Sequence, residues 1–343
     1  MPLLSSRREF LASVAATAIT SHIRAEAAPP AGKTLRGAFM ILHTPFTASG
    51  SVDWEDLARE VAFVDRAGAQ GVVWPQGSSS VQTLTREERL RGMEVLAKAI
   101  QGKKAALVLG VQGKDTAEML QYAERAEALA PDAVIAMPPT AAASMDDYKS
   151  YFRALAARAR RPVIVQTSGG ARNLVPSTDL IADLAREFPN CGYVKEESEP
   201  VVERMKEEIR QRPPVGAMRG IFGANFGAGW LYEMRLGLDG VITGNAMYAD
   251  LMARIWDLHV HGRDDTLRDA YGRFLLLRNL EEQIPGASLY VMKKRGIFKT
   301  MVRRTGPAGS DGVPRFSELK LAPEAIEEIE YRFEALKPYL ATS

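Results

Sequence analysis

Short apolar runs alternate with amphipathic segments along most of the chain. Most runs start about 30 residues after the one before, which is the length of a strand, a helix and two loops. The runs are almost continuously apolar, which is typical of parallel strands buried on both faces. The eight runs are Ala38–Leu42, Gly71–Trp74, Ala105–Val111, Ala133–Met137, Pro162–Gln166, Gly192–Lys195, Arg219–Phe222 and Gly240–Thr243.

The segments between the runs carry helix signals. Leu57, Val61 and Val64 are spaced so that they lie on one face of a helix. Thr85 followed by Glu88 is a capping box, in which each side chain bonds the backbone N–H of the other residue. Strands therefore alternate regularly with helices.

Eight such units in one compact chain predict an α/β fold, the (β/α)8 or TIM barrel. A doubly wound open sheet is the main alternative, and it normally carries a glycine-rich loop after its first strand. The turn here, His43–Phe46 (HTPF), contains no glycine. From about Tyr248 the pattern becomes mainly helical. We expect a barrel over residues 28–247 and a C-terminal helical extension over residues 248–343 packed on the barrel.

The N-terminus has the features of an export signal. Arg7 and Arg8 precede a mildly apolar run, and Ala25–Ala27 forms a small-x-small cleavage motif. This pattern predicts a twin-arginine signal peptide over residues 1–27 and a periplasmic mature protein. An ordinary charged first helix is the alternative.

Composition narrows the class of protein. The 343 residues are 46% hydrophobic and 25% charged, which is ordinary for a globular protein. A net charge of +2 gives no reason to expect nucleic acid as a partner. No run reaches the roughly 18 apolar residues that span a bilayer. Cys191 is the single cysteine and there are four histidines, so we expect no disulfide within the chain, no metal site and no cofactor.

Lys195 is the most conspicuous reactive residue. Active sites of such barrels lie at the carboxyl ends of the strands, and Lys195 ends the sixth predicted strand. Burial penalises the ammonium form of lysine, and a neutral amine can attack a ketone to form a Schiff base. A structural ion pair with Glu196 or Glu197 is the alternative.

Three motifs occur in the order and spacing of a known family. GAFMILHTPFTASGSVD is similar to its first strand, VVWPQGSSSVQTLTREER to its hydroxyl-bearing loop and the helix that follows, and GYVKEES to the strand with its catalytic lysine. Over roughly residues 37–304 the chain resembles the dihydrodipicolinate synthase / N-acetylneuraminate lyase family of Schiff-base barrels. The resemblance implies a TIM barrel, a Schiff base on Lys195, and a homodimer or homotetramer.

The chain departs from this family at the proton relay. Gln166 stands where the family has a tyrosine after the fifth strand, and an amide can orient a substrate but cannot shuttle a proton. Thr140 takes the place of a second relay tyrosine, and Arg172 lies near the position of the arginine that binds the substrate carboxylate. We therefore do not expect the standard dihydrodipicolinate synthase reaction.

Strand alternation points to a replacement for the relay. If Lys195 faces inward, Glu197 also faces inward and Glu196 faces outward. Glu197 is then a candidate general acid/base beside the imine. A solvated carboxylate or an ion-pair partner of Lys195 is the alternative. His43 is a second candidate acid/base, with a structural histidine as its alternative.

These features predict a Schiff-base lyase or aldolase, or a dehydratase, that acts on a 2-oxo acid or keto sugar acid. Lys195, Glu197 and Thr140 are the expected catalytic residues. The alternative is a barrel that has lost catalysis and binds a small carboxylate ligand. Substrate contacts are expected from Thr44, Gly77, Ser78, Ser79, Gln166, Thr167, Arg172, Asn225 and Asn245.

Overall fold

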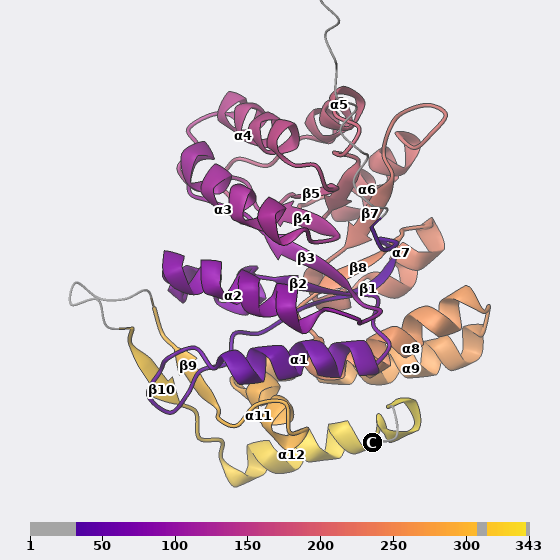
Figure 1. Cartoon of the computed structure of the whole chain (residues 1–343). Coiled ribbons are helices and arrows are strands. Elements are labelled where there is room, and N and C mark those ends of the chain that lie inside the picture. Colours follow the sequence, from indigo (N-terminus) through magenta and orange to yellow (C-terminus); the bar gives the residue numbers. More distant parts are fainter. Residues whose placement is uncertain (1–31, 307–313, 341–343) are drawn as a thin grey trace, which may run out of the picture. The chain divides into compact units, whose positions relative to one another are not determined.

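The computed structural model describes residues 32–306 and 314–340. Eight parallel strands close into a barrel in sequence order, with β1 paired to both β2 and β8 (Figure 1). The predicted TIM barrel is therefore confirmed. The barrel strands are β1 (Gly37–Ile41), β2 (Gly71–Trp74), β3 (Ala106–Gly110), β4 (Ala133–Ala136), β5 (Val163–Gln166), β6 (Tyr193–Lys195), β7 (Gly220–Gly223) and β8 (Gly240–Thr243).

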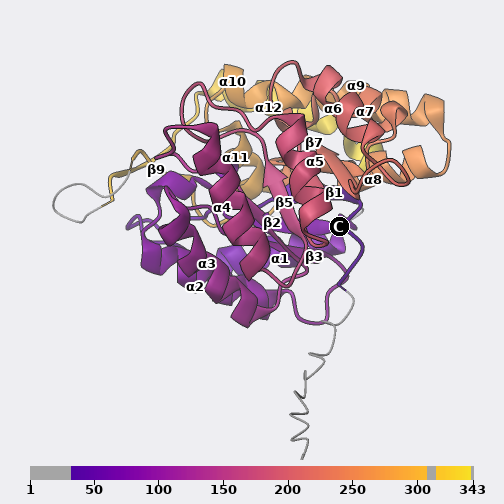
Figure 2. The ribbon, with the colours of Figure 1, turned by 90° about the horizontal axis from the view of Figure 1, so that it is seen from above.

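Helices surround the strands (Figure 2). The last helix of this ring, α8, packs against β1 and α1 and so follows the closure of the sheet. It lies within the segment that the sequence assigned to the extension. The helices of the ring are α1 (Trp54–Arg66), α2 (Arg86–Ala99), α3 (Thr116–Leu129), α4 (Met145–Arg158), α5 (Thr178–Glu187), α6 (Val201–Arg210), α7 (Trp230–Leu236) and α8 (Ala249–Val260).

Two apolar layers hold the barrel together. Inside the sheet, Phe39 and Phe222 meet edge to face, with ring centroids 5.5 Å apart. Outside it, Leu57, Val61 and Val64 of α1 are fully buried in the larger cluster between strands and helices, as their spacing predicts. Because large side chains fill the interior, a ligand can enter only at an end of the barrel.

Helix starts fix the loops at the carboxyl end of the sheet. Thr85 and Glu88 form the predicted capping box at the start of α2. Arg304 forms two hydrogen bonds of 2.7 Å with the carboxylate of Glu88, and it also donates to the carbonyl of Gly50. The C-terminal segment is thereby tied to the loops that follow β1 and β2.

The predicted C-terminal helical extension is present. Its helix α12 packs on α9, and Ile329, Phe333 and Leu336 are buried in the main cluster. The extension comprises α9 (Asp264–Arg278), α10 (Leu280–Gln283), α11 (Ala287–Lys294), α12 (Pro323–Glu334) and the antiparallel pair β9 (Val302–Arg304) and β10 (Phe316–Glu318).

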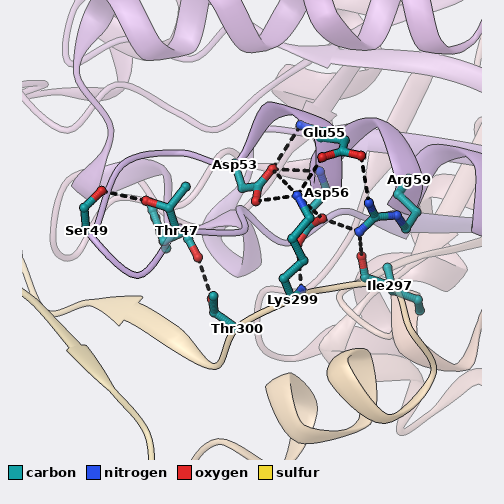
Figure 3. Close-up of polar contacts among 10 residues, drawn as sticks. Thr47, Ser49, Asp53, Glu55, Asp56, Arg59, Ile297, Lys299 and Thr300 are labelled. Atoms are coloured by element: carbon teal, nitrogen blue, oxygen red, sulfur yellow. Dashed lines mark hydrogen bonds and ion pairs between the residues drawn. The ribbon is translucent and has the colours of Figure 1, made fainter.

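A polar cluster fastens this extension to the start of α1 (Figure 3). Nζ of Lys299 lies 3.1 Å from Asp53, 2.7 Å from Glu55 and 3.3 Å from Asp56. Asp53 also accepts backbone N–H groups as the N-cap of α1. Hydrogen bonds to Glu55 and Asp53 raise the pKa of Lys299, so the amine stays charged.

Within the part of the chain that the structure describes, no helix is long and apolar enough to cross a membrane. The predicted signal peptide, residues 1–27, lies outside the described residues.

Candidate active site

Lys195 lies inside the barrel at the end of β6. It pairs in register with Gln166 of β5 and Phe222 of β7, and Phe222 belongs to the cluster inside the sheet. Partners in parallel register point to the same face, so the side chain of Lys195 points inward. Lys195 is only 5% exposed.

The amine opens into a cavity of about 230 Å³, which we call the inner chamber. The walls combine apolar side chains of β1 and β8 with polar groups from the strand ends. Its lining consists of Ile41, Ser78, Ser168, Lys195, Glu197, Asn225, Phe226, Ile242, Thr243 and Gly244. Of the substrate contacts expected from sequence, Ser78 and Asn225 therefore line the same cavity as the amine.

A chain of polar contacts leads away from Lys195. Nζ lies 3.1 Å from Oε1 of Glu197, and Ser168 donates a hydrogen bond to the same oxygen. The amide nitrogen of Gln166 donates to Ser168 at 3.3 Å. Glu197 thus faces inward, as the alternation predicts. Ser168, which sequence reasoning did not select, joins the tyrosine-replacing Gln166 to the carboxylate.

Thr167, an expected substrate ligand, does not line the inner chamber. Its hydroxyl donates to Oε1 of Glu196 at 2.7 Å and accepts the N–H of Glu197 at 3.1 Å, both outside the sheet. The reason is alternation, because Gln166 shares the inward face with Lys195 and Thr167 must share the outward face with Glu196. Thr167 instead fixes the backbone of Glu197 from behind.

Glu196 belongs to a separate buried network between the sheet and α6. Arg204 lies 2.9 Å from Oε2 of Glu196. Burial, and then the neighbouring charge of Glu196, raise the pKa of Glu208, so Glu208 is held in its protonated form. The inward carboxylate, Glu197, and the outward one, Glu196, therefore have different partners and different surroundings.

The hydroxyl loop after β2 contributes one side chain, that of Ser78, to the inner chamber. Ser79 instead donates to the carbonyl of Leu42 at 2.6 Å and is fully buried. Thr44 donates to the carbonyl of Ser79 at 2.6 Å and accepts from Trp74 at 3.0 Å. Both hydroxyls therefore hold the loop that presents Ser78, and Ser79, an expected substrate contact, lines neither the inner chamber nor the cavity that adjoins it.

The turn after β7 has an unusual backbone. Asn225 and Phe226 have φ values of 46° and 50°, in the left-handed region that such residues rarely adopt. Asn245 donates to the carbonyl of Phe226 at 3.0 Å, and Arg278 donates to Oδ1 of Asn225 at 3.2 Å. Asn245 thus supports this turn and does not line the inner chamber.

A second cavity of about 360 Å³, the outer chamber, adjoins the first. The two share Ser78, Phe226 and Gly244. A Cβ at Gly244 would lie 2.5 Å from the hydroxyl oxygen of Ser78, so only glycine fits at this junction. The remaining lining is His43, Thr44, Phe46, Gly77, Ser80, Asn245, Met247, Tyr248, Leu277, Arg278, Leu280, Glu281, Glu282, Ala287, Ser288, Leu289, Val302, Arg303 and Leu319.

Two predicted site residues lie elsewhere. Thr140 and Arg172 are both exposed, and neither lines the inner or the outer chamber. Both follow strands in loops whose path depends on tertiary packing, so counting along the sequence could not place them. Thr140 is therefore not in place to serve as a relay, and Arg172 is not in place to bind a carboxylate in this cavity.

Among residues 32–306 and 314–340, no group of three or more His, Cys, Asp and Glu side chains is arranged to hold a metal ion. The reactive groups of the inner chamber are therefore an amine, a carboxylate and hydroxyls. Such a set can form an imine and move protons beside it.

Comparisons with curated proteins find similar enzymes. A 4-hydroxy-tetrahydrodipicolinate synthase from Chlorobium chlorochromatii is 28% identical over 276 residues, which are 78% of this chain and 90% of that protein. Another from Chlorobaculum parvum is 30% identical over 214 residues, 62% of this chain and 70% of that protein.

Solved structures with the same fold include dihydrodipicolinate synthase from Rhodopseudomonas palustris, with a TM-score of 0.75, 23% identity, and coverage of 88% of this chain and 97% of that one. N-acetylneuraminate lyase from Proteus mirabilis has a TM-score of 0.72, 19% identity, and coverage of 90% and 100%. The model of the Dihydrodipicolinate synthetase family matches residues 34–303, which include every barrel strand. The chain therefore belongs to the dihydrodipicolinate synthetase family.

Proposed function

We propose that the protein is a Schiff-base-forming lyase or aldolase that acts on a 2-oxo acid through Lys195. One observation carries this proposal: a lysine amine lies inside the barrel in a chamber of about 230 Å³, beside a carboxylate 3.1 Å away. Dehydration uses the same imine and is compatible with the same residues.

The neighbouring carboxylate can accept a proton from the amine of Lys195. Transfer of a proton from Nζ of Lys195 to Glu197 leaves a neutral amine, which attacks the carbonyl carbon of the 2-oxo acid. The carbonyl oxygen leaves as water, and the protonated imine then accepts the electron pair of a neighbouring bond as that bond breaks. An enamine results, which takes up a proton before water hydrolyses the imine. Glu197 is the proposed acid/base for the steps at the imine.

We propose further that the reaction is not the standard one of the dihydrodipicolinate synthases. No tyrosine lines the inner chamber among the described residues. In its place stands the linked set of Gln166, Ser168 and Glu197, in which the carboxylate replaces a phenol as the proton carrier. We therefore expect the molecule that reacts with the enamine to differ from the second substrate of the dihydrodipicolinate synthases.

Borohydride trapping tests the proposal. Pyruvate with borohydride should leave a covalent adduct on Lys195, located by peptide mass spectrometry. The informative variant is Lys195→Arg, because it keeps a positive charge beside Glu197 but cannot form the imine. Exposed Lys293 provides the matched control, Lys293→Arg. Absence of an adduct with pyruvate and other 2-oxo acids, or an equal adduct in Lys195→Arg, contradicts the proposal. Binding of an acid without an adduct or a product would favour a barrel that has lost catalysis.

We also propose export to the periplasm and assembly into a homodimer or homotetramer. Replacing Arg7 and Arg8 by lysine should retain the protein in the cytoplasm, as cell fractionation would reveal. Light scattering of the mature chain should give twice or four times its mass.

A further inference from the structure

His43 forms a pair with a carboxylate that the proposed chemistry of Lys195 does not use. It follows β1, lines the outer chamber, and has a side chain that is 15% exposed. Nδ1 of His43 lies 3.4 Å from Oε1 of Glu60, and the same oxygen accepts the backbone N–H of His43 at 3.1 Å. Glu60 comes from α1, so the contact joins the end of β1 to that helix.

Glu60 is fully buried. Among the described residues, neither its other oxygen, Oε2, nor Nδ1 of His43 has a hydrogen-bond partner, so the ring and the carboxylate are near each other without a hydrogen bond between them. Burial raises the pKa of Glu60, whereas the charge and the backbone N–H of His43 act in the opposite direction. A buried carboxylate needs a proton or a cation nearby, and His43 can supply either one. The imidazole and the carboxylate therefore lie close enough to act as an acid/base pair.

The position of His43 places its ring beside any molecule in the outer chamber. Because Nδ1 faces Glu60, Nε2 is the ring nitrogen left for a molecule in that chamber. A carboxylate at Nδ1 fixes the tautomer of a histidine and stabilises its protonated form. The same arrangement recurs in enzymes that use histidine as a general acid and base.

Other charged groups face the outer chamber from the extension. Arg278 of α9 is hydrogen-bonded to Asn225, and Glu281 of α10 accepts the backbone N–H groups of Gly286 and Ser288. Glu282 and Arg303 also line it. On the side of α1, Asp56 adds a negative charge that acts on Glu60. These groups contribute to the field around the histidine, but among them His43 and Glu60 are the imidazole and carboxylate that lie 3.4 Å apart.

We propose that His43, oriented by Glu60, is a second acid/base that acts on the part of the substrate extending from the inner into the outer chamber. This inference rests on the proposed function, since Lys195 must first hold the 2-oxo acid. In cleavage, His43 takes the proton of a hydroxyl group on the carbon beyond the bond that breaks. The oxygen becomes an aldehyde carbonyl, and the electron pair of the broken carbon–carbon bond converts the iminium on Lys195 into an enamine.

In condensation the same step runs in reverse. The enamine carbon attacks the aldehyde carbon, and protonated His43 donates its proton to the aldehyde oxygen. Glu60 is the positioning residue in both directions. This assignment divides the labour, because Glu197 serves the imine in the inner chamber and His43 serves the aldehyde oxygen in the outer one.

Two reactions separate these roles. Exchange of the pyruvate methyl protons in D2O, followed by NMR, needs the imine and enamine on Lys195 and the proton carrier Glu197 beside them, but not His43. Condensation of pyruvate with acetaldehyde, glyceraldehyde or benzaldehyde needs the second acid as well. His43→Asn and His43→Gln should keep the exchange and lower condensation by about 100-fold or more. The matched control is His261→Asn, because His261 is exposed and bonds within its own helix region.

Glu60→Gln gives a signature that a structural role would not give. Loss of the carboxylate disfavours protonated His43, so the decline of condensation with rising pH should begin at lower pH than in the wild type. An unchanged pH profile overturns the role of Glu60.

Normal condensation in the His43 variants, or an equal loss of exchange and condensation, overturns the role of His43. Exchange without condensation of any of these aldehydes by the wild type does so as well. If the wild type shows neither exchange nor a borohydride adduct, the proposed function fails, and this inference fails with it.

Discussion

Nζ of Lys195 lies 3.1 Å from Oε1 of Glu197, and the two side chains are 6% and 17% exposed. They are two positions apart on the strand, so both point into the same chamber. Removing one member of such a pair leaves the other charge buried and alone, which is costly. A variant that keeps the shape of the side chain adds no cavity to this cost and is therefore the informative one.

Glu197→Gln keeps the shape of the side chain but removes the carboxylate, the group that can accept and donate a proton. The amine of Lys195 is still present, and water in the chamber can accept its proton, so the borohydride adduct with pyruvate should still form. Proton transfer beside the imine should be lost, and exchange of the pyruvate methyl protons should fall by about 100-fold or more.

The matched control for this variant is Glu199→Gln, because Glu199 is an exposed carboxylate two positions along the chain. It should exchange pyruvate protons at the wild-type rate. Equal exchange rates in both variants would rule out Glu197 as the acid/base.

The barrel and its lysine were predictable because their signals are local. Strands buried on both faces are continuous apolar runs, and each observed barrel strand overlaps a predicted one. Alternation by two also places Lys195 and Glu197 on one face. The same rule applied to β5 places Gln166 and Ser168 on the inward face and Thr167 on the outward face. The inward position of Ser168 could therefore have been predicted from the sequence.

Other parts of the site depend on packing that no local pattern encodes. Ser79 is a hydroxyl in the expected loop, but it bonds the carbonyl of Leu42, which is 37 positions away. The pairing of His43 with Glu60 joins a strand end to a helix, and only the docking of α1 brings them together. The outer chamber needs α9, α10 and β9, whose placement follows from tertiary contacts.

The lining of the outer chamber predicts a preference among aldehydes. Phe46, Met247, Leu277, Leu280 and Leu289 are among its apolar walls. Burying an aromatic ring there should contribute about 1.5–3 kcal/mol, or roughly 10- to 100-fold in kcat/KM. With pyruvate as donor, benzaldehyde should therefore react with a higher kcat/KM than glyceraldehyde. A preference for glyceraldehyde would indicate a polar chamber and contradict this prediction.

Arg304 should be important for stability. Its side chain is 1% exposed and bonds both carboxylate oxygens of Glu88 as well as the carbonyls of Gly50 and Thr83. Arg304→Met leaves these acceptors without their donor, which should reduce the free energy of unfolding by about 3–5 kcal/mol. Urea unfolding followed by circular dichroism would measure the loss.

Arg268 provides the comparison for this effect. Its pair with Asp265 is exposed, with 3.3 Å between the charged atoms. Arg268→Met should change the free energy of unfolding by less than about 1 kcal/mol. Similar losses in the two variants would show that the buried network around Arg304 stabilises the fold no more than an exposed ion pair does.

Glu233 of α7 is a buried carboxylate of a different kind. It is 5% exposed, and its Oε2 has no hydrogen-bond partner among the described residues. The carboxylate lies against the backbone of Gly223, where a Cβ would approach Oε2 to 1.9 Å. Burial raises the pKa of Glu233 from 4.5 to about 7, so folding favours the protonated form.

This shift predicts how stability changes with pH. Below pH 4.5 Glu233 is protonated in both the folded and the unfolded chain, and its contribution to stability is fully present. As pH rises towards about 7, the unfolded chain releases the proton first, so the contribution is lost, to a total of about 3 kcal/mol. Glu233→Gln cannot ionise, so its free energy of unfolding, measured in urea at pH 5 and pH 8, should fall less than that of the wild type. Equal declines in the two proteins would mean that Glu233 ionises in the folded chain as it does in water.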